Sequence, residues 1–106
     1  VGNDKEIGAI DLFDFDPYHQ KVGLGILIAD PDDRRSGYAS EAVVLIKEYC
    51  FSHLGLHQIY CNILSKNRAS VNLFEKSGFT ICGTKKEWVK SDDGWEDELL
   101  LQSINL

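Results

Sequence analysis

Apolar residues recur at two different spacings along the chain, and the first stretch shows the alternating spacing of β-strands. Residues 5–15 and 21–29 both carry this pattern, and residues 16–19 (DPYH) are turn formers. We therefore predict an N-terminal β-hairpin. Gly23 and Gly25 lie inside its second strand with no third glycine before a helix, which predicts close packing in the sheet rather than a dinucleotide-binding loop.

The pattern then switches to helical spacing. Apolar side chains recur every three or four positions over residues 38–54, and Gly55 follows as a helix-ending residue. Residues 58–64 are apolar on both faces apart from Asn62, which is typical of a buried parallel strand. A strand that follows a helix in this way indicates a crossover connection.

A second, shorter helix is predicted over residues 68–77. Asn67 is placed to cap its first turn and Gly78 to end it. In such an ending, the side chains of Phe74 and Phe79 are expected to meet.

The last part of the chain predicts two strands, 80–88 and 95–104, joined by a hairpin loop at 90–94. The whole order is strand, strand, helix, strand, helix, strand, strand. This order predicts an α/β (α+β) fold in which both helices pack against one mixed sheet. At 106 residues, we expect a single domain spanning residues 1–106.

Composition and charge argue against some classes of function. A formal net charge of −6 argues against a nucleic-acid surface and favours a cationic partner. No apolar run reaches membrane-spanning length and no leader pattern is seen, so we expect a cytoplasmic protein without a membrane partner. Cys50, Cys61 and Cys82 lie in apolar patterns and are predicted to be reduced core residues.

The turn at residues 34–39 is the strongest candidate for a binding site. It places Gly37 and unpaired backbone N–H groups at the start of the long helix, with Arg34 and Arg35 beside them. This combination suits a phosphate-bearing ligand. The alternative is a helix start that satisfies its own N–H groups.

Three motifs, in order and at a common spacing, resemble those of the GNAT superfamily of N-acetyltransferases, in the branch with RimJ/RimL-type and spermidine acetyltransferases. They are Arg34-x-x-Gly37-x-Ala39, the Asn67-led helix that ends in Lys76-x-Gly78-Phe79, and Gly94-Trp95-x-Asp97. The resemblance covers nearly the whole chain. It implies a twisted, mostly antiparallel sheet, and acetyl-CoA as co-substrate with no metal.

The resemblance also implies which residues bind acetyl-CoA. They are Leu27, Ile28 and Ala29 along the pantetheine arm, on a strand that splays from its neighbour; Arg34, Arg35, Ser36, Gly37, Tyr38, Ala39 and Ser40 around the pyrophosphate; Asn67 near the thiol; and Lys76 near the nucleotide. The backbone N–H of Ile28 is the expected oxyanion donor.

The implied reaction is direct transfer of the acetyl group to a primary amine of a protein N-terminus, a polyamine or a small molecule. A lysine-like amine must first lose a proton, at a cost of about 4.6 kcal/mol at neutral pH, whereas an α-amine needs only about one pKa unit. A base or water chain is therefore expected. Phe74 stands where the spermidine branch has a tyrosine acid, so the catalytic residues stay unassigned, with Ser70 or water as hypotheses.

Two rival functions stay open at this point. A catalytically silent acetyl-CoA-binding or regulatory module is compatible with Phe74, and an unrelated nucleotide-binding domain could use Gly37 for its phosphates. The chain has no Met and begins within strand patterning, so we expect the family's N-terminal strand and helices to lie outside it. A bare sheet edge would then favour association, including a homo-oligomer.

Several side chains permit two interpretations. The carboxylates of Asp11, Asp14 and Asp16 fit either an acidic acceptor patch or solvated strand positions, and the roles of Tyr18 and His19 are equally open. Trp88 and Trp95 are expected to pack within the last hairpin rather than to form an acceptor platform. His53 and His57 are separated by Gly55, which disfavours a metal pair.

Overall fold

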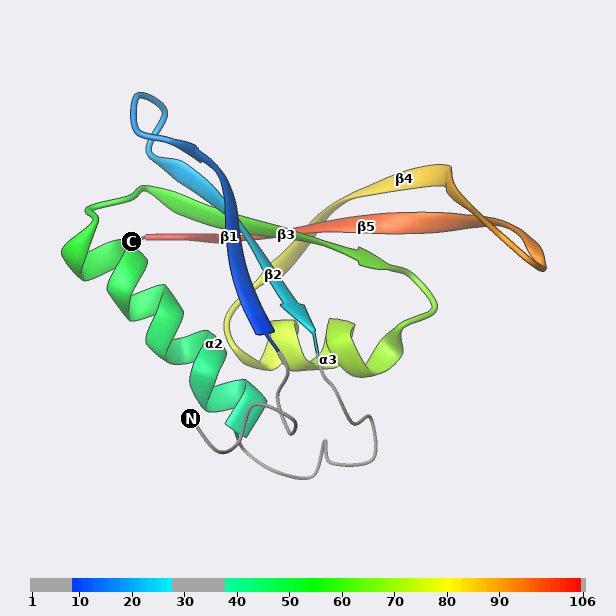
Figure 1. Ribbon diagram of the computed structural model, residues 1–106, viewed down its shortest axis with the longest axis horizontal. Coiled ribbons are helices and arrows are strands. Elements are labelled where there is room, and N and C mark those ends of the chain that lie inside the picture. The colour runs from blue at the N-terminus through cyan, green and yellow to red at the C-terminus, as the bar shows by residue number, and fades with distance from the viewer. Residues whose placement is uncertain (1–8, 28–37, 106) are drawn as a thin grey trace.

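The computed structural model describes residues 9–27 and 38–105. Its elements are β1 (Ala9–Asp16), β2 (Lys21–Leu27), α2 (Tyr38–Glu48), the π-helix η2 (Tyr49–His53), β3 (Gln58–Leu64), α3 (Arg68–Lys76), β4 (Thr80–Ser91) and β5 (Gly94–Ile104). The five strands form one sheet in the order β1-β2-β3-β5-β4 (Figure 1). Only the β2–β3 pair is parallel, which confirms the predicted mixed, mostly antiparallel sheet.

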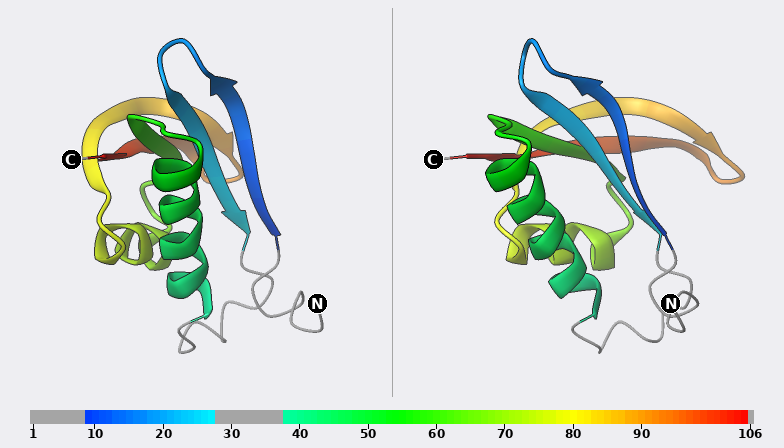
Figure 2. Two further views of the ribbon diagram at one scale, coloured as in Figure 1. Left: turned by 90° about the vertical axis from the view of Figure 1, so that its left-hand side faces the viewer. Right: turned by 60° about the vertical axis from the view of Figure 1, so that its left-hand side comes forward.

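Both helices pack on the same face of this sheet (Figure 2). Every second residue of β3 is buried toward them, and the residues between are partly or fully exposed on the other face. Among the described elements none covers that other face. None of the described helices is long and apolar enough to cross a membrane.

The predicted end of the long helix is confirmed, since its last turn ends at His53 with Leu54 as the C-cap, but this turn is a π-helix in which the Leu54 N–H donates to the Tyr49 carbonyl at 3.1 Å. The last hairpin has a shorter loop than expected, since β4 continues to Ser91, which pairs with Gly94. Gly94 permits this tight connection with a φ of 124°.

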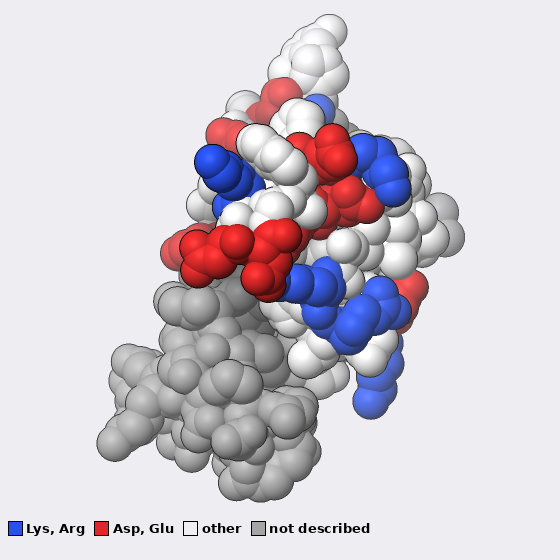
Figure 3. Space-filling model, turned by 90° about the vertical axis from the view of Figure 1, so that its right-hand side faces the viewer, with Lys and Arg blue, Asp and Glu red and all other residues white. Residues whose placement is uncertain are grey.

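The β4–β5 hairpin extends well beyond the helices, as Figure 1 shows. Acidic and basic side chains are interspersed over this end of the molecule (Figure 3). Three lysines pair with carboxylates of β5: Lys66 with Glu96, Lys85 with Glu98, and Lys86 with Asp97. Such opposite-charge pairs stabilise neighbouring strands modestly.

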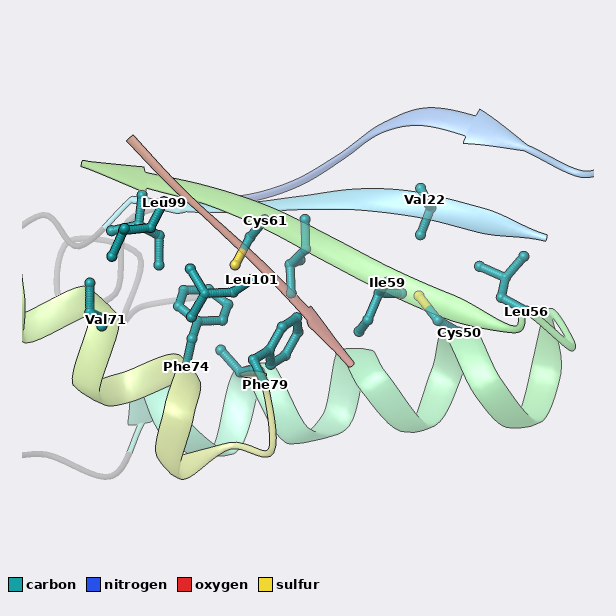
Figure 4. Close-up of a cluster of buried hydrophobic side chains, with 13 residues drawn as sticks. Val22, Cys50, Leu56, Ile59, Cys61, Val71, Phe74, Phe79, Leu99 and Leu101 are labelled. Carbon is teal, nitrogen blue, oxygen red and sulfur yellow. The ribbon is translucent and has the colours of Figure 1, made fainter. Parts of the chain in front are cut away.

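The core lies between the helices and the sheet (Figure 4). Cys61 and Leu101 point from the sheet toward Phe74 and Phe79. The two phenyl rings meet edge to face with centroids 5.1 Å apart, as predicted. Cys50 and Cys61 are buried and free, but the prediction for Cys82 is wrong: it is exposed, because β4 is the edge strand and its register shifts at this residue.

The predicted end of α3 is also confirmed. Gly78 has a φ of 98°, and the N–H groups of Gly78 and Phe79 donate to the carbonyls of Glu75 at 3.1 Å and Phe74 at 2.9 Å. This is the bonding pattern of a Schellman cap. Lys47 of α2 adds a hydrogen bond from its Nζ to the Ser77 carbonyl at 2.7 Å, which ties the two helices together.

Candidate active site

β2 and β3 diverge partway along their length. They pair only at Lys21–Gln58, Val22–Ile59 and Gly23–Tyr60. Beyond this point β2 stays paired with β1 as far as Leu27, and β3 stays paired with β5 as far as Leu64. Figure 1 shows the two halves of the sheet opening like a wedge. The facing edges of the two strands are therefore open to hydrogen bonding by an extended ligand.

A cleft of about 230 Å³ lies in this wedge. Four elements contribute to its lining: β2, β3, α3 and β5. The lining residues are Leu24, Gly25, Cys61, Asn62, Ile63, Leu64, Asn67, Ser70, Phe74 and Glu98. The open strand edges and the beginning of α3 thus meet in one place.

Asn67 and Ser70 bring the N-terminus of α3 to the cleft. The Oδ1 atom of Asn67 accepts the Ser70 N–H at 3.3 Å, which confirms the predicted N-cap. Both residues line the cleft. The positive end of the helix dipole therefore faces the cleft and favours a group that carries negative charge there.

Phe74 and Cys61 form the apolar floor of the cleft. The Phe74 side chain is only 1% exposed and offers no proton donor. Burial raises the pKa of the Cys61 thiol to about 12, so Cys61 is protonated at neutral pH and is a poor nucleophile. Neither side chain supplies acid, base or nucleophile for a reaction in the cleft.

A polar cluster at the cleft was not predicted from the sequence. The Lys85 Nζ atom donates to Asn62 Oδ1 at 2.8 Å and pairs with Glu98 Oε1 at 2.8 Å. Asn62 and Glu98 both line the cleft. The strand alternation alone placed Asn62 on a sheet face, but the contact with Lys85 depends on strand order and on two register shifts in β4, which no local pattern signals.

The other predicted cofactor residues are distributed as follows. Leu27 ends β2 beside the wedge, and Tyr38, Ala39 and Ser40 form the first turn of α2. Lys76 is exposed at the far end of α3, roughly 13 Å along the helix from Asn67, and does not line the cleft. Ile28, Ala29, Arg34, Arg35, Ser36 and Gly37 lie outside the described residues.

The aspartates of the first hairpin do not reach the cleft. Asp11 and Asp14 are exposed on β1. Asp16 accepts the His19 N–H at 3.0 Å and pairs with His19 Nδ1 at 2.8 Å. The backbone hydrogen bond is the main cause of its lowered pKa. Asp16, Tyr18 and His19 therefore stabilise a turn.

The two tryptophans of the last hairpin are each 60% exposed, and Trp88 packs within that hairpin against a side chain of β4. The Trp88 ring lies beside Lys85, whose Nζ is 5.2 Å from the ring centroid. Because β4 shifts register between Lys85 and Val89, the local strand pattern did not predict this contact.

Residues 1–80 match the family model described as the acetyltransferase (GNAT) domain. The chain belongs to the GNAT acetyltransferase family. It is 30% identical over 105 residues to the probable N-acetyltransferase YjcK of Bacillus subtilis strain 168, covering 99% of this chain and 58% of that protein. It is 32% identical over 73 residues to the spermidine N(1)-acetyltransferase of Vibrio cholerae serotype O1, covering 69% of this chain and 42% of that one.

Solved structures show the GNAT fold directly. A chimera of spermidine N-acetyltransferase SpeG from Vibrio cholerae and hSSAT superposes with a TM-score of 0.84 at 26% identity, covering 92% of this chain and 58% of the other. A dodecameric structure of the Vibrio cholerae enzyme gives a TM-score of 0.82 at 26% identity, covering 92% of this chain and 57% of the other. This GNAT chain spans about 58% of the length of the first of these relatives.

Proposed function

We propose that this chain forms the acetyl-CoA site of an N-acetyltransferase that transfers the acetyl group to a primary amine by direct attack in a ternary complex. The observation that carries the proposal is the divergence of β2 from β3 after Gly23, with the N-terminus of α3 at the resulting cleft. An extended thioester carrier can add to the open edge of β2 as a strand would.

In this arrangement the pantetheine arm runs along Leu27, Ile28 and Ala29. The pyrophosphate lies at the turn 34–40, where the backbone N–H groups and two arginines attract it. Asn67 contacts the thiol end of the carrier, and Lys76 the nucleotide end.

The reaction forms a C–N bond and breaks the C–S bond of the thioester. The backbone N–H of Ile28 stabilises the tetrahedral oxyanion. The amine proton leaves to a base or to water, and the thiolate takes a proton from water or from Ser70. Phe74 cannot donate that proton, but a thiolate is a tolerable leaving group because a thiol has a pKa of about 8.5.

The acceptor is proposed to be a cationic amine. Curated relatives include spermidine N(1)-acetyltransferases and an alpha/beta-tubulin-N-acetyltransferase, so both polyamine and protein amines belong in the panel of acceptors. The dodecameric relative supports a homo-oligomer. We place the protein in the cytoplasm, where acetyl-CoA and reduced thiols coexist.

A silent acetyl-CoA-binding or regulatory module is the second candidate. It is favoured by Phe74, which leaves the cleft without the acid expected from the spermidine branch. Both candidates require coenzyme binding, and only the enzyme requires turnover.

The binding test is calorimetry of the protein against acetyl-CoA, CoA, ATP and NAD. We expect acetyl-CoA and CoA to bind and the other two not to. Gly37→Val should abolish coenzyme binding, since a branched side chain would block close approach of the backbone to the pyrophosphate. Gly83→Val is the matched control, because a Cβ at Gly83 has no neighbour within 4 Å. Unchanged affinity of Gly37→Val would remove the turn from the site.

The activity test is release of free thiol from acetyl-CoA with α-amino peptides, spermidine and an aminosugar as acceptors. Release with one class of amine identifies an enzyme. Coenzyme binding without release from any acceptor identifies the regulatory module.

A further inference from the structure

The ammonium group of Lys85 occupies a complete cation-binding site. It touches a carboxylate, Glu98 Oε1, and an amide oxygen, Asn62 Oδ1, each at 2.8 Å. The ring of Trp88 lies 5.2 Å away as a third contact. An anion, a neutral acceptor and an aromatic face are the groups that recognise a primary ammonium ion in proteins.

This site opens onto the cleft from the side away from the helices. Asn62 lies between the buried residues Cys61 and Ile63, and Glu98 precedes the buried Leu99, so both side chains project from the uncovered face of the sheet. Both also line the cleft. Asn67, Ser70 and Phe74 line it from the helix side.

A thioester held at the helix side leaves the opposite side for the attacking amine. An acceptor that reaches the wedge from the face that none of the described elements covers meets Glu98 and Asn62 at its mouth. A polyamine acceptor keeps a charged ammonium group, the same chemical group that Lys85 carries, besides the amine that must lose its proton to attack. The Lys85 side chain is 30% exposed, so it can withdraw toward solvent without being pulled from the core.

We propose that Glu98, Asn62 and Trp88 form the binding subsite for the acceptor's ammonium group, and that Lys85 occupies this subsite until an acceptor displaces it. The proposal rests on the acetyl-transfer function proposed above. It makes Lys85 an internal competitor: a cationic acceptor binds as Lys85 leaves, whereas an uncharged amine analogue gains nothing from Glu98.

The kinetic test uses variants of the two charged residues. Lys85→Met keeps most of the length of the side chain and removes its charge, so the KM for the amine should fall several-fold. Glu98→Gln removes the anion and should raise that KM about tenfold to a hundredfold, the usual effect of losing a charge-assisted hydrogen bond. The affinity for CoA, measured by calorimetry, should stay unchanged in both variants.

A second Lys–Glu pair, between the turn after β3 and strand β5, provides the controls. Lys66 pairs with Glu96 of β5, and neither residue lines the cleft. Lys66→Met and Glu96→Gln should therefore leave the KM for the amine unchanged. If Lys85→Met and Glu98→Gln lower the melting temperature but leave the KM for the amine unchanged, the Lys85–Glu98 pair is a structural cross-strand contact and the proposal is overturned.

A direct binding test separates this proposal from the acetyl-transfer function. In a Trp95→Phe background, titration of spermidine into Lys85→Met should change the fluorescence of Trp88, and adding Glu98→Gln should abolish the change. This response without any thiol release would leave the subsite standing and refute acetyl transfer. Thiol release without this response, and with unchanged KM values, would refute the subsite alone.

Discussion

Among the glycines that the structure describes, Gly23 leaves the least room for a Cβ. It lies in β2 where the two strands begin to diverge, opposite Phe13 of β1. A Cβ built at Gly23 would clash with the Phe13 ring. That ring also contacts Tyr60 edge to face, with centroids 5.9 Å apart, so its movement is restricted. The predicted close packing is therefore confirmed at Gly23 but not at Gly25, where a Cβ would have ordinary van der Waals contact.

Gly23→Ala should lower the free energy of unfolding by about 1 to 3 kcal/mol, since it overpacks the strand pair. Urea denaturation measures the change. Gly25→Ala is the matched control, because its Cβ would meet Phe13 only at 3.9 Å. Phe13→Leu should restore part of the stability of Gly23→Ala. Equal stability of the two alanine variants would contradict this account.

Cys61 makes stability depend on pH in the alkaline range. Burial raises its folded-state pKa from 9.0 to about 12. The unfolded chain therefore releases this proton first, and the free energy of unfolding should fall as the pH rises from about 9 toward 12. Burial also raises the pKa of Cys50 and Tyr60, so part of the decline has other sources.

Cys61→Val should make that decline shallower, as measured by urea denaturation at about pH 8 and about pH 10.5. Cys82→Ala removes an exposed thiol instead, so the free energy of unfolding should fall with pH almost as steeply as in the wild type. If Cys61→Val kept the full wild-type slope, ionisation of this thiol would not contribute.

Among the elements, β4 contains the least regular backbone. Lys85 pairs with Glu98 and Val89 pairs with Glu96, so an advance of four residues along β4 corresponds to only two residues along β5. Glu87, within this bulge, has a φ of 49°. Asp97 supports the bulge, because its Oδ1 accepts the Glu87 N–H at 2.9 Å and its Oδ2 pairs with Lys86 at 3.1 Å. A bulge of this kind re-aims side chains, here Trp88 toward Lys85.

Asp97→Ala should loosen the bulge and increase the mobility of Trp88, because the Glu87 N–H loses its acceptor. Fluorescence anisotropy in a Trp95→Phe background should fall, and the KM for the amine should rise if Trp88 binds the acceptor. Asp92→Ala, in the exposed loop of the hairpin, should change neither quantity. An unchanged anisotropy in Asp97→Ala would show that the backbone holds the bulge without this side chain.

Over the whole molecule, the net charge of −6 acts on both proposed substrates. It attracts a cationic amine and repels the anionic coenzyme, which must rely on local contacts. Salt screens both effects, with a Debye length of about 10 Å at 0.1 M.

Raising the salt concentration should therefore increase the KM for spermidine and leave the KM for acetyl-CoA unchanged or lower. Thiol release at about 0.02 M and about 0.2 M NaCl measures both. Parallel changes in the two KM values would show that the net charge does not select the substrates.

Features that depend on neighbouring residues could be predicted from the sequence alone. The Asn67 cap, the glycine-ended turn after α3 with its Phe74–Phe79 contact, and the order of the elements are local or periodic, and the structure confirms them. They follow from hydrogen-bond geometry and from which positions share a face.

The resemblance implied a splayed strand, but only the tertiary structure decided at which residue the strands part and which distant side chains meet. The gap after Gly23 depends on three strands at once, and the contact of Lys85 with Asn62 and Glu98 depends on strand order and on the bulges of β4. The exposure of Cys82 and the π turn at Tyr49–His53 likewise depend on edge position and packing. Local patterns specify which face a side chain takes, whereas register between strands distant in sequence is set by the packing of the whole sheet.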